Sequence, residues 1–235
     1  MEDFSNAIAM ADAVISSGNY ALVTGSAYVE QFVDGASSEA ILEMAYDAGD
    51  NNGGNSLGRM YTENGYGDYL PAKDLLDLID PADIRLQMFT ADPVLTGIYC
   101  CVRVTKWRTA NGQDHVPVIR LSEVYLNRAE ARARSGQDAS AQADLNLIRQ
   151  RGLATAPDVT LTGAALLADI LIERRIELGY EGHRIHDIMR HKQDVARVDV
   201  TGDIAFQGYP CNFCILPIPF EETDANPNIT QNDGY

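Results

Sequence analysis

The pattern of apolar and charged residues is most regular around residues 169–190, where it predicts two helices that meet at a glycine. Apolar side chains recur at steps of three and four, the spacing that lines one face of a helix; they are Leu167, Ile170, Leu171 and Leu178. Carboxylates form a second row with a step of four, close to several arginines: Glu173, Glu177 and Glu181 beside Arg174, Arg175 and Arg184. Gly182 is typical of the residue after a helix end, and a shorter helix with Ile185, Ile188 and Met189 inward is expected beyond it. This is more charge than a surface helix needs, so part of it is expected to be buried.

The same reasoning places other elements along the chain. Apolar spacing predicts helices over residues 4–17 and 118–134, another from Asp138 through Ile148, and a short one after Pro71. Residues 40–45 are expected to form a short strand or buried segment, and 99–107 a strand. The Gly- and Asn-rich stretch 47–56 is expected to be a loop. The predicted fold is therefore mainly α-helical, with a few short strands and long loops.

Polar residues share one face of the predicted helix 118–134: Arg120, Glu123, Asn127, Glu130 and Arg134. Two carboxylates on one face are compatible with the paired acids of a glycosidase. However, an acid catalyst needs a raised pKa, and basic residues within one helical turn keep both carboxylates ionised. We therefore expect this face to form an internal ion network with the carboxylate row of residues 173–181 and Arg184.

Composition and charge exclude several classes of function. The chain has 235 residues, of which 46% are hydrophobic, enough for one sizeable core or two small ones. A net charge of −16 repels nucleic acid and anionic lipid headgroups, so no nucleic-acid partner is expected, and the acidity is interpreted as a solubility feature. The sequence has no run of about eighteen apolar residues, so no membrane-spanning helix is expected. Acidic residues interrupt positions 1–20, so neither a signal peptide nor a lipid-modified cysteine is expected there.

The cysteines give little support for metal or redox chemistry. Cys100 and Cys101 are adjacent, and neighbours on a strand face opposite ways, so they are poorly placed to share a metal. Cys211 and Cys214 form a Cys-x-x-Cys pair that runs into an extended segment, whereas catalytic redox pairs precede a helix. Unreactive thiols or one structural disulfide are expected instead.

Two further candidate metal motifs lack a ligand that they would need. A calcium loop beginning at Asp50 would need a glutamate where Tyr61 stands. His183 and His186 have no evident third ligand, so a capping or hydrogen-bonding role is expected for them. No metal, cofactor or catalytic residue is assigned.

Aromatic and amide residues gather in residues 57–70 and near the only tryptophan. A sugar ring offers an apolar face that stacks on aromatic rings and hydroxyls that pair with amides or carboxylates. The candidate ligand contacts are Trp107, Tyr61, Tyr66, Tyr69, Asn64 and Asn111. The alternatives are that the tyrosines pack their loop onto the helices and that Trp107 is a half-buried anchor instead of an exposed stacking platform.

Five motifs in the same order resemble those of SusD/RagB-type outer-membrane glycan-binding proteins. They are RLSEVYLNRAEA (120–131), LNLIRQR (145–151), ERRIELGYEGHRIHDIMR (173–190), ILPIP (215–219) and the ending with Asn226-Pro227 and QNDGY (231–235). Looser matches occur at GNYAL (18–22), EAILE (39–43) and DIR (83–85). The five motifs are spread over about half of the chain, from residue 120 to residue 235.

The resemblance implies a SusD-like α-helical fold with a tetratricopeptide-like helix pair. It implies a single domain over residues 1–235, with a loop-rich, ligand-side region (1–115) and a helical motif region with an extended tail (116–235). Because such proteins are usually about twice this long, the chain is interpreted as the C-terminal half of one, either a fragment or a shortened relative. The implied function is non-catalytic glycan binding on the outer face of the outer membrane, with delivery of oligosaccharide to a SusC-like TonB-dependent transporter.

Two other classes of function stay open at this stage. A helical-repeat module for protein–protein interaction would show an exposed apolar groove on the helices of residues 118–148. A glycoside hydrolase would need a deep pocket with a carboxylate or histidine that is not paired with arginine.

Overall fold

The computed structural model describes residues 1–235 except for 1, 33–36, 68, 96–101, 110 and 197–205. The chain forms two compact units, Met1–Glu181 and Gly182–Tyr235. The border coincides with the predicted glycine corner, where Gly182 has a φ of +86° that favours glycine.

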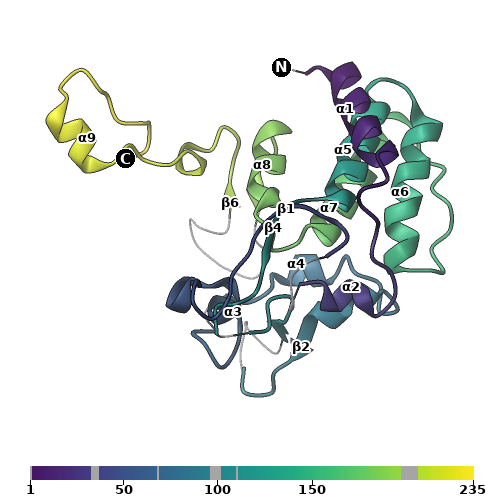
Figure 1. The fold of residues 1–235 in the computed structure, drawn as a ribbon. Helices are drawn as coiled ribbons and strands as arrows, with labels where there is room; N and C mark the ends of the chain where they lie inside the picture. Colours follow the sequence, from purple (N-terminus) through teal and green to yellow (C-terminus); the bar gives the residue numbers. More distant parts are fainter. Residues whose placement is uncertain (1, 33–36, 68, 96–101, 110, 197–205) are drawn as a thin grey trace. The chain divides into compact units, whose positions relative to one another are not determined.

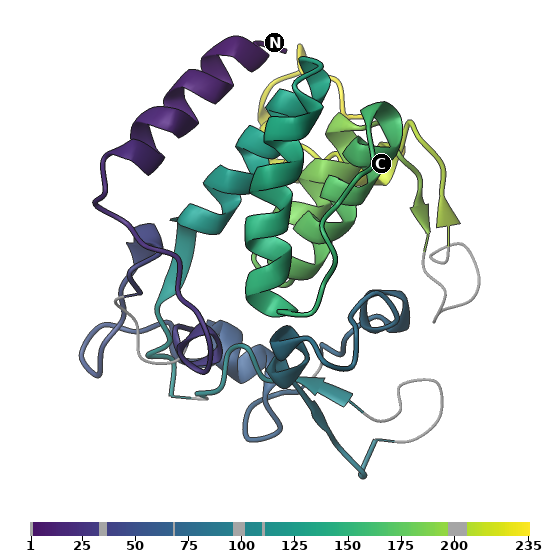
Figure 2. The ribbon, with the colours of Figure 1, turned by 90° about the vertical axis from the view of Figure 1, so that its right-hand side faces the viewer.

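One part of the N-terminal unit is a group of helices (Figures 1 and 2). It consists of α1 (Phe4–Ser16), α5 (Leu121–Arg134), α6 (Asp138–Gly152) and α7 (Gly163–Glu177). Helix α5 packs against the other three. Small side chains at the α5–α6 contact, Ala129, Ala133 and Ala141, let the two helices approach closely, while Leu145, Ile148 and Ile170 fill the core. This is the predicted tetratricopeptide-like helix pair, with α7 covering its apolar face.

The other part of the N-terminal unit is rich in loops and contains short elements. They are α2 (Ala27–Glu30), β1 (Ala40–Met44), η1 (Gly53–Asn55), α3 (Leu57–Tyr61), α4 (Lys73–Leu76), η2 (Ile84–Met88), β2 (Phe89–Ala91), β3 (Val102–Val104) and β4 (Val116–Arg120). Strands β1 and β4 pair antiparallel, with Ala40 opposite Arg120, and β2 pairs antiparallel with β3. A second core of Tyr28, Val29, Phe32, Met88 and Trp107 holds these segments together.

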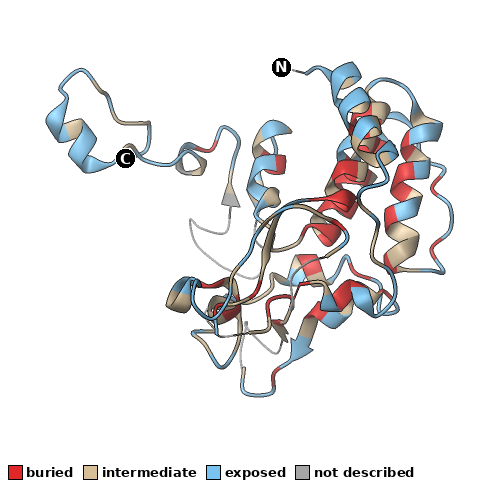
Figure 3. Cartoon of the chain, viewed as in Figure 1, coloured by how far each residue is buried: buried red, intermediate tan, exposed pale blue. Residues whose placement is uncertain are grey.

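Figure 3 shows buried residues along the helices of this unit, and α5, α6 and α7 each carry several of them. The expected short strand at 40–45 and the helices at 4–17 and from Asp138 are confirmed. The prediction of helix from residue 118 is wrong, because Val116–Arg120 forms strand β4 against β1 and the helix begins at Leu121. Leu166, one residue before the predicted Leu167, lies in the core.

The C-terminal unit contains α8 (His183–Arg190), β5 (Val195–Ala196), β6 (Phe206–Gln207), η4 (Asn212–Cys214) and α9 (Phe220–Ala225). Strands β5 and β6 pair antiparallel. In α8, Ile188 is buried as predicted, whereas Ile185 is exposed. The side-chain amide of Gln231 binds both backbone groups of Ile218 at 2.8 Å. These two hydrogen bonds join the ILPIP motif to the QNDGY ending. None of the described helices is long and apolar enough to cross a membrane.

Candidate functional site

Glu177 is the centre of a buried charge network in the N-terminal unit. Its carboxylate accepts hydrogen bonds from Arg120 Nη1 at 2.6 Å, from Arg85 Nη1 at 3.2 Å and from Arg151 Nη2. The hydroxyl of Tyr28 donates a further bond at 3.1 Å. The Glu177 side chain is fully buried, so its charge is compensated by these groups and not by water.

The network extends outward from Glu177 on two sides. Arg85 Nη1 lies 2.5 Å from Glu173 Oε1, and Arg151 also pairs with Glu39. Arg120 binds both oxygens of Glu181 at 2.7 Å, and Lys106 Nζ lies 2.5 Å from Glu181 Oε1. We call this set the arginine network: Arg85, Lys106, Arg120, Arg151, Glu39, Glu173, Glu177 and Glu181.

The arginine network confirms the expected internal ion network in part: of the predicted polar face of helix α5, Arg120 is a member, whereas Glu130 pairs with Arg134 on the same helix. Arg120 joins the carboxylate row as predicted, and Arg174 donates to Asn127 Oδ1 at 2.6 Å. Sequence reasoning missed Glu39, Arg85, Lys106 and Arg151 as members. All except Lys106 lie in the motifs 39–43, 83–85 and 145–151, so their position in these motifs could have identified them as members of the network. Arg184 lies in the C-terminal unit.

The network keeps Glu177 and Glu181 ionised. Burial alone raises the pKa of Glu177, but the charges of Arg151, Arg120 and Arg85 hold this pKa well below its ordinary value. Burial likewise opposes ionisation of Glu181, and Arg120 and Lys106 lower its pKa overall. Such carboxylates suit a structural role and not that of a general acid.

The tyrosine-bearing loop is built on the short helix α3. The Ser56 side chain caps α3 by accepting a hydrogen bond from Arg59 N at 3.2 Å. The chain then folds back so tightly that a Cβ on Gly65 would lie 2.0 Å from the carbonyl oxygen of Arg59. Tyr66 N donates to the same carbonyl at 2.7 Å, and Arg103 Nη1 donates to Gly67 O at 2.9 Å. The loop is therefore fixed to both α3 and β3.

This geometry presents two of the predicted tyrosines to solvent. Tyr66 is 58% exposed and Tyr69 is 55% exposed, and Arg59 lies 5.3 Å from the Tyr66 ring centroid. Tyr61 is half-buried and packs edge-on against Tyr69, with ring centroids 5.9 Å apart. Asn64 is exposed between them in the chain. We call the surface of Tyr61, Asn64, Tyr66 and Tyr69 the tyrosine surface.

A polar pocket of about 260 Å³ shares Asn64 with the tyrosine surface. Hydroxyl, carboxylate and guanidinium groups line it, including Thr62, Glu63, Asp92, Arg103 and Arg108. Arg103 pairs with Asp92 and, through this hydrogen bond, lowers the pKa of the Asp92 carboxyl. The pocket therefore offers both donors and acceptors beside exposed aromatic rings.

Trp107 does not contribute to this surface. Its side chain is fully buried, and its ring packs edge-on against Phe32 at 5.8 Å, so the expectation of an exposed stacking platform is wrong. The physical reason is that Trp107 fills the second core, where no sugar can reach it. Asn111 is exposed, and its side chain accepts a hydrogen bond from Gln113 N at 3.0 Å. The neighbouring Gly112 approaches Gly53, on the loop that leads into α3.

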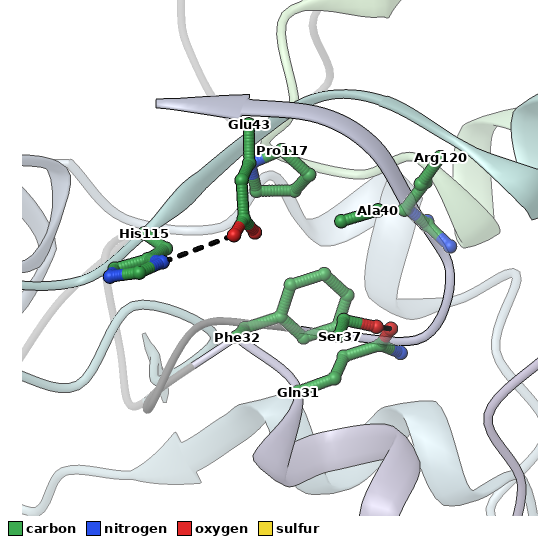
Figure 4. Close-up of a pocket in the computed structure, with 8 residues that line it drawn as sticks. All are labelled: Gln31, Phe32, Ser37, Ala40, Glu43, His115, Pro117 and Arg120. Carbon is green, nitrogen blue, oxygen red and sulfur yellow. Dashed lines mark hydrogen bonds and ion pairs between the residues drawn. The ribbon is translucent and has the colours of Figure 1, made fainter. Parts of the chain in front are cut away.

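A second hollow lies between β1 and the segment after α2 (Figure 4). Glu43 and His115 point toward one another there, with His115 Nδ1 3.3 Å from Glu43 Oε1, above the ring of Phe32. The hollow has a volume of about 10 Å³, which suffices for one water molecule and no larger ligand.

The described cysteines form a disulfide. Cys211 and Cys214 are bonded to each other, one of the two alternatives that the sequence left open. Cys100 and Cys101 lie outside the described residues. Across the part of the chain that the structure describes, no three His, Cys, Asp or Glu side chains are grouped so as to hold a metal ion.

Comparison with known proteins identifies relatives of this architecture. The profile of the SusD family matches residues 95–235. The starch-binding protein SusD of Bacteroides thetaiotaomicron is 32% identical over 124 residues, which are 51% of this chain and 21% of that protein. A SusD-like protein of Formosa agariphila is 32% identical over 133 residues, 53% of this chain and 25% of that protein.

Solved structures extend the similarity to nearly the whole chain. A SusD superfamily protein from Bacteroides vulgatus has a TM-score of 0.84 and 30% identity, covering 99% of this chain and 56% of that one. A SusD-like carbohydrate binding protein from the same organism has a TM-score of 0.78 and 25% identity, covering 96% and 55%. This chain thus spans little more than half the length of these structures. It belongs to the SusD family.

Proposed function

We propose that this chain binds oligosaccharide without catalysis and that the tyrosine surface makes the contact. Membership of the SusD family supports carbohydrate as the ligand class, since one relative is a starch-binding protein and a structural neighbour is a carbohydrate binding protein. The observation that carries the proposal is the pair of exposed rings, Tyr66 and Tyr69, held on a fixed loop beside a polar pocket.

The chemistry of the surface matches that of a sugar. Aromatic faces stack on the apolar C–H face of a pyranose, and exposed rings that are already ordered lose little entropy on binding. Asn64 supplies an amide donor and acceptor, and the pocket supplies the hydroxyl of Thr90 and the carboxylate of Glu63. Binding by stacking and hydrogen bonds alone requires no nucleophile, general acid or cofactor.

The state of the buried carboxylates supports binding over hydrolysis. Glu177 and Glu181 are ionised and paired with cations, whereas a glycosidase needs one carboxyl group that is protonated near neutral pH. They are also buried, so they do not flank a cleft that could receive a glycosidic bond.

The family resemblance extends the proposal to location and partner. We infer display on the outer face of the outer membrane and delivery of the bound oligosaccharide to a SusC-like TonB-dependent transporter. Affinity purification of the tagged protein from a native outer membrane tests this inference. Co-purification of a TonB-dependent barrel is expected, and its absence from membranes that contain the transporter would contradict delivery.

Calorimetric titration with a panel of oligosaccharides tests sugar binding and its site. Removing one stacking ring by Tyr69→Ala or Tyr66→Ala is expected to weaken binding about threefold to tenfold. Tyr235→Ala is the matched control, because Tyr235 is comparably exposed, at 51%, but lies in the C-terminal unit. Equal losses in all three variants, or no binding of any sugar by the folded parent, would contradict the proposal. The second result would instead favour a protein ligand.

A further inference from the structure

Tyr180, between α7 and the glycine corner, adopts a backbone conformation that tyrosine rarely takes. Its φ is +65°, in the left-handed region where a Cβ is strained. Residues in such conformations persist where the surroundings fix them, and they concentrate at functional sites.

The residues on either side of Tyr180 are held by the arginine network. Lys106 Nζ donates to Gly179 O at 2.9 Å and pairs with Glu181 at 2.5 Å. Arg120 binds both carboxylate oxygens of Glu181 and donates to Glu177 O at 2.6 Å. Lys106 and Arg120 are themselves buried, and both cations lie over the ring of Phe32. The backbone at Tyr180 is therefore clamped from both sides.

The ring of Tyr180 extends from this clamp to the tyrosine surface. It packs edge-on against Tyr61, with centroids 5.3 Å apart and planes at 80°, and against Phe89 at 6.0 Å. Tyr61 in turn packs edge-on against the exposed ring of Tyr69. Burial raises the pKa of Tyr61, consistent with a ring enclosed by its neighbours. Three tyrosine rings thus connect the clamped backbone to the exposed face.

We propose that Tyr180 is a positioning residue: the clamp on its backbone sets the Tyr61 ring, which in turn orients Tyr69 for stacking on the ligand. The ligand part of this inference rests on the proposed function, whereas the ring contacts do not. If Tyr180 has this role, the arginine network affects ligand affinity through packing and not through contact with sugar. Preorganised rings bind more tightly than mobile ones because less freedom is lost.

The test introduces 3-fluorotyrosine at position 69 and records its ¹⁹F NMR resonance in variants of the full chain. Tyr180→Asn removes the ring but keeps a residue that tolerates positive φ, while Tyr180→Phe retains the ring as the matched control. We expect Tyr180→Asn to shift or broaden the resonance and Tyr180→Phe to leave it in place. Tyr180→Gly accepts the same backbone and serves if the Asn variant does not fold. An unchanged resonance in a folded variant without the ring overturns the proposal.

Sugar titration of the same variants separates this inference from the proposed function. Tyr180→Asn is expected to weaken binding about threefold to tenfold, and Tyr180→Phe less than about twofold. A shifted resonance with no sugar binding by the parent refutes the proposed function but leaves the ring coupling established. Parental affinity in Tyr180→Asn, with the parent binding sugar, overturns the positioning role.

Discussion

Replacing Glu177 by glutamine tests how far the N-terminal unit depends on the arginine network. Glutamine keeps the size of the side chain but removes the charge that neutralises Arg85, Arg120 and Arg151. Breaking a buried ion pair by removing one partner costs about 3–5 kcal/mol, because the remaining charges stay buried and uncompensated. For a protein of this size, each kcal/mol lowers the melting temperature by about 2–4 °C, so the expected decrease is roughly 6–20 °C.

Tyr28→Phe is the matched control for this variant. It removes one hydrogen bond to the same carboxylate but leaves every charge in place, so a loss of about 1–2 kcal/mol is expected. Differential scanning calorimetry of parent and both variants at pH 7 measures the two effects. Glu177→Gln melting at or above the temperature of Tyr28→Phe would show that the charges around Glu177 are not coupled as the geometry indicates.

Three further predictions concern stability. The pKa of Glu177 is lowered on balance in the folded state, so the contribution of this carboxylate to stability is complete above its unfolded pKa of about 4.3 and is lost as the pH falls below that value. Over that acidic range, the melting temperature of the parent should drop more steeply than that of Glu177→Gln. Asp144 is a buried partner of two arginines, so Asp144→Asn should lower the free energy of unfolding by about 3 kcal/mol in denaturant unfolding. Asp12 is a half-exposed partner of the same arginines, so Asp12→Asn should lower it by less than about 1 kcal/mol. Gly65→Ala should clash with the carbonyl of Arg59 and speed proteolysis within residues 57–70.

Local sequence patterns predicted the helices well, because the buried residues of a helix recur with the same period as the apolar residues in the sequence. The expected helix from Asp138 and the alanines of the α5–α6 contact fill the first core. The pattern failed at Val116–Arg120, where pairing with β1 overrides local helix preference. Strand pairing with a segment some 75 residues away is a tertiary effect, which cannot be predicted from the local spacing of apolar residues.

The motifs that carry the family resemblance are mostly structural. Arg85, Arg120, Arg151 and Glu177 come from four separate motifs and meet in one buried network. Sequence reasoning recognised excess charge around Glu177 and joined Arg120 to it, but it missed Tyr28, Arg85 and Arg151, because side chains as far as 149 residues apart in the chain pair only after folding.

The candidate ligand contacts were harder to rank from sequence. A lone tryptophan between Lys106 and Arg108 suggests an exposed position, because charged residues usually lie at the surface. Lys106 is instead buried together with Trp107 and pairs with Glu181, so this neighbour did not indicate exposure. The tyrosines alternate with glycines in a loop, and their exposure depends on how Gly65 and Gly67 turn the chain. Composition indicated the kind of surface, and the turns decide which rings reach solvent.

A crystal structure of this chain with its tightest-binding oligosaccharide, chosen from the titration panel, would show whether the tyrosine surface holds the sugar. We expect a sugar ring in van der Waals contact with the faces of Tyr66 or Tyr69, with hydroxyls within hydrogen-bonding distance of Asn64 or the adjoining pocket. Sugar bound elsewhere on the chain, with the tyrosine surface free of lattice contacts and empty, would contradict this expectation.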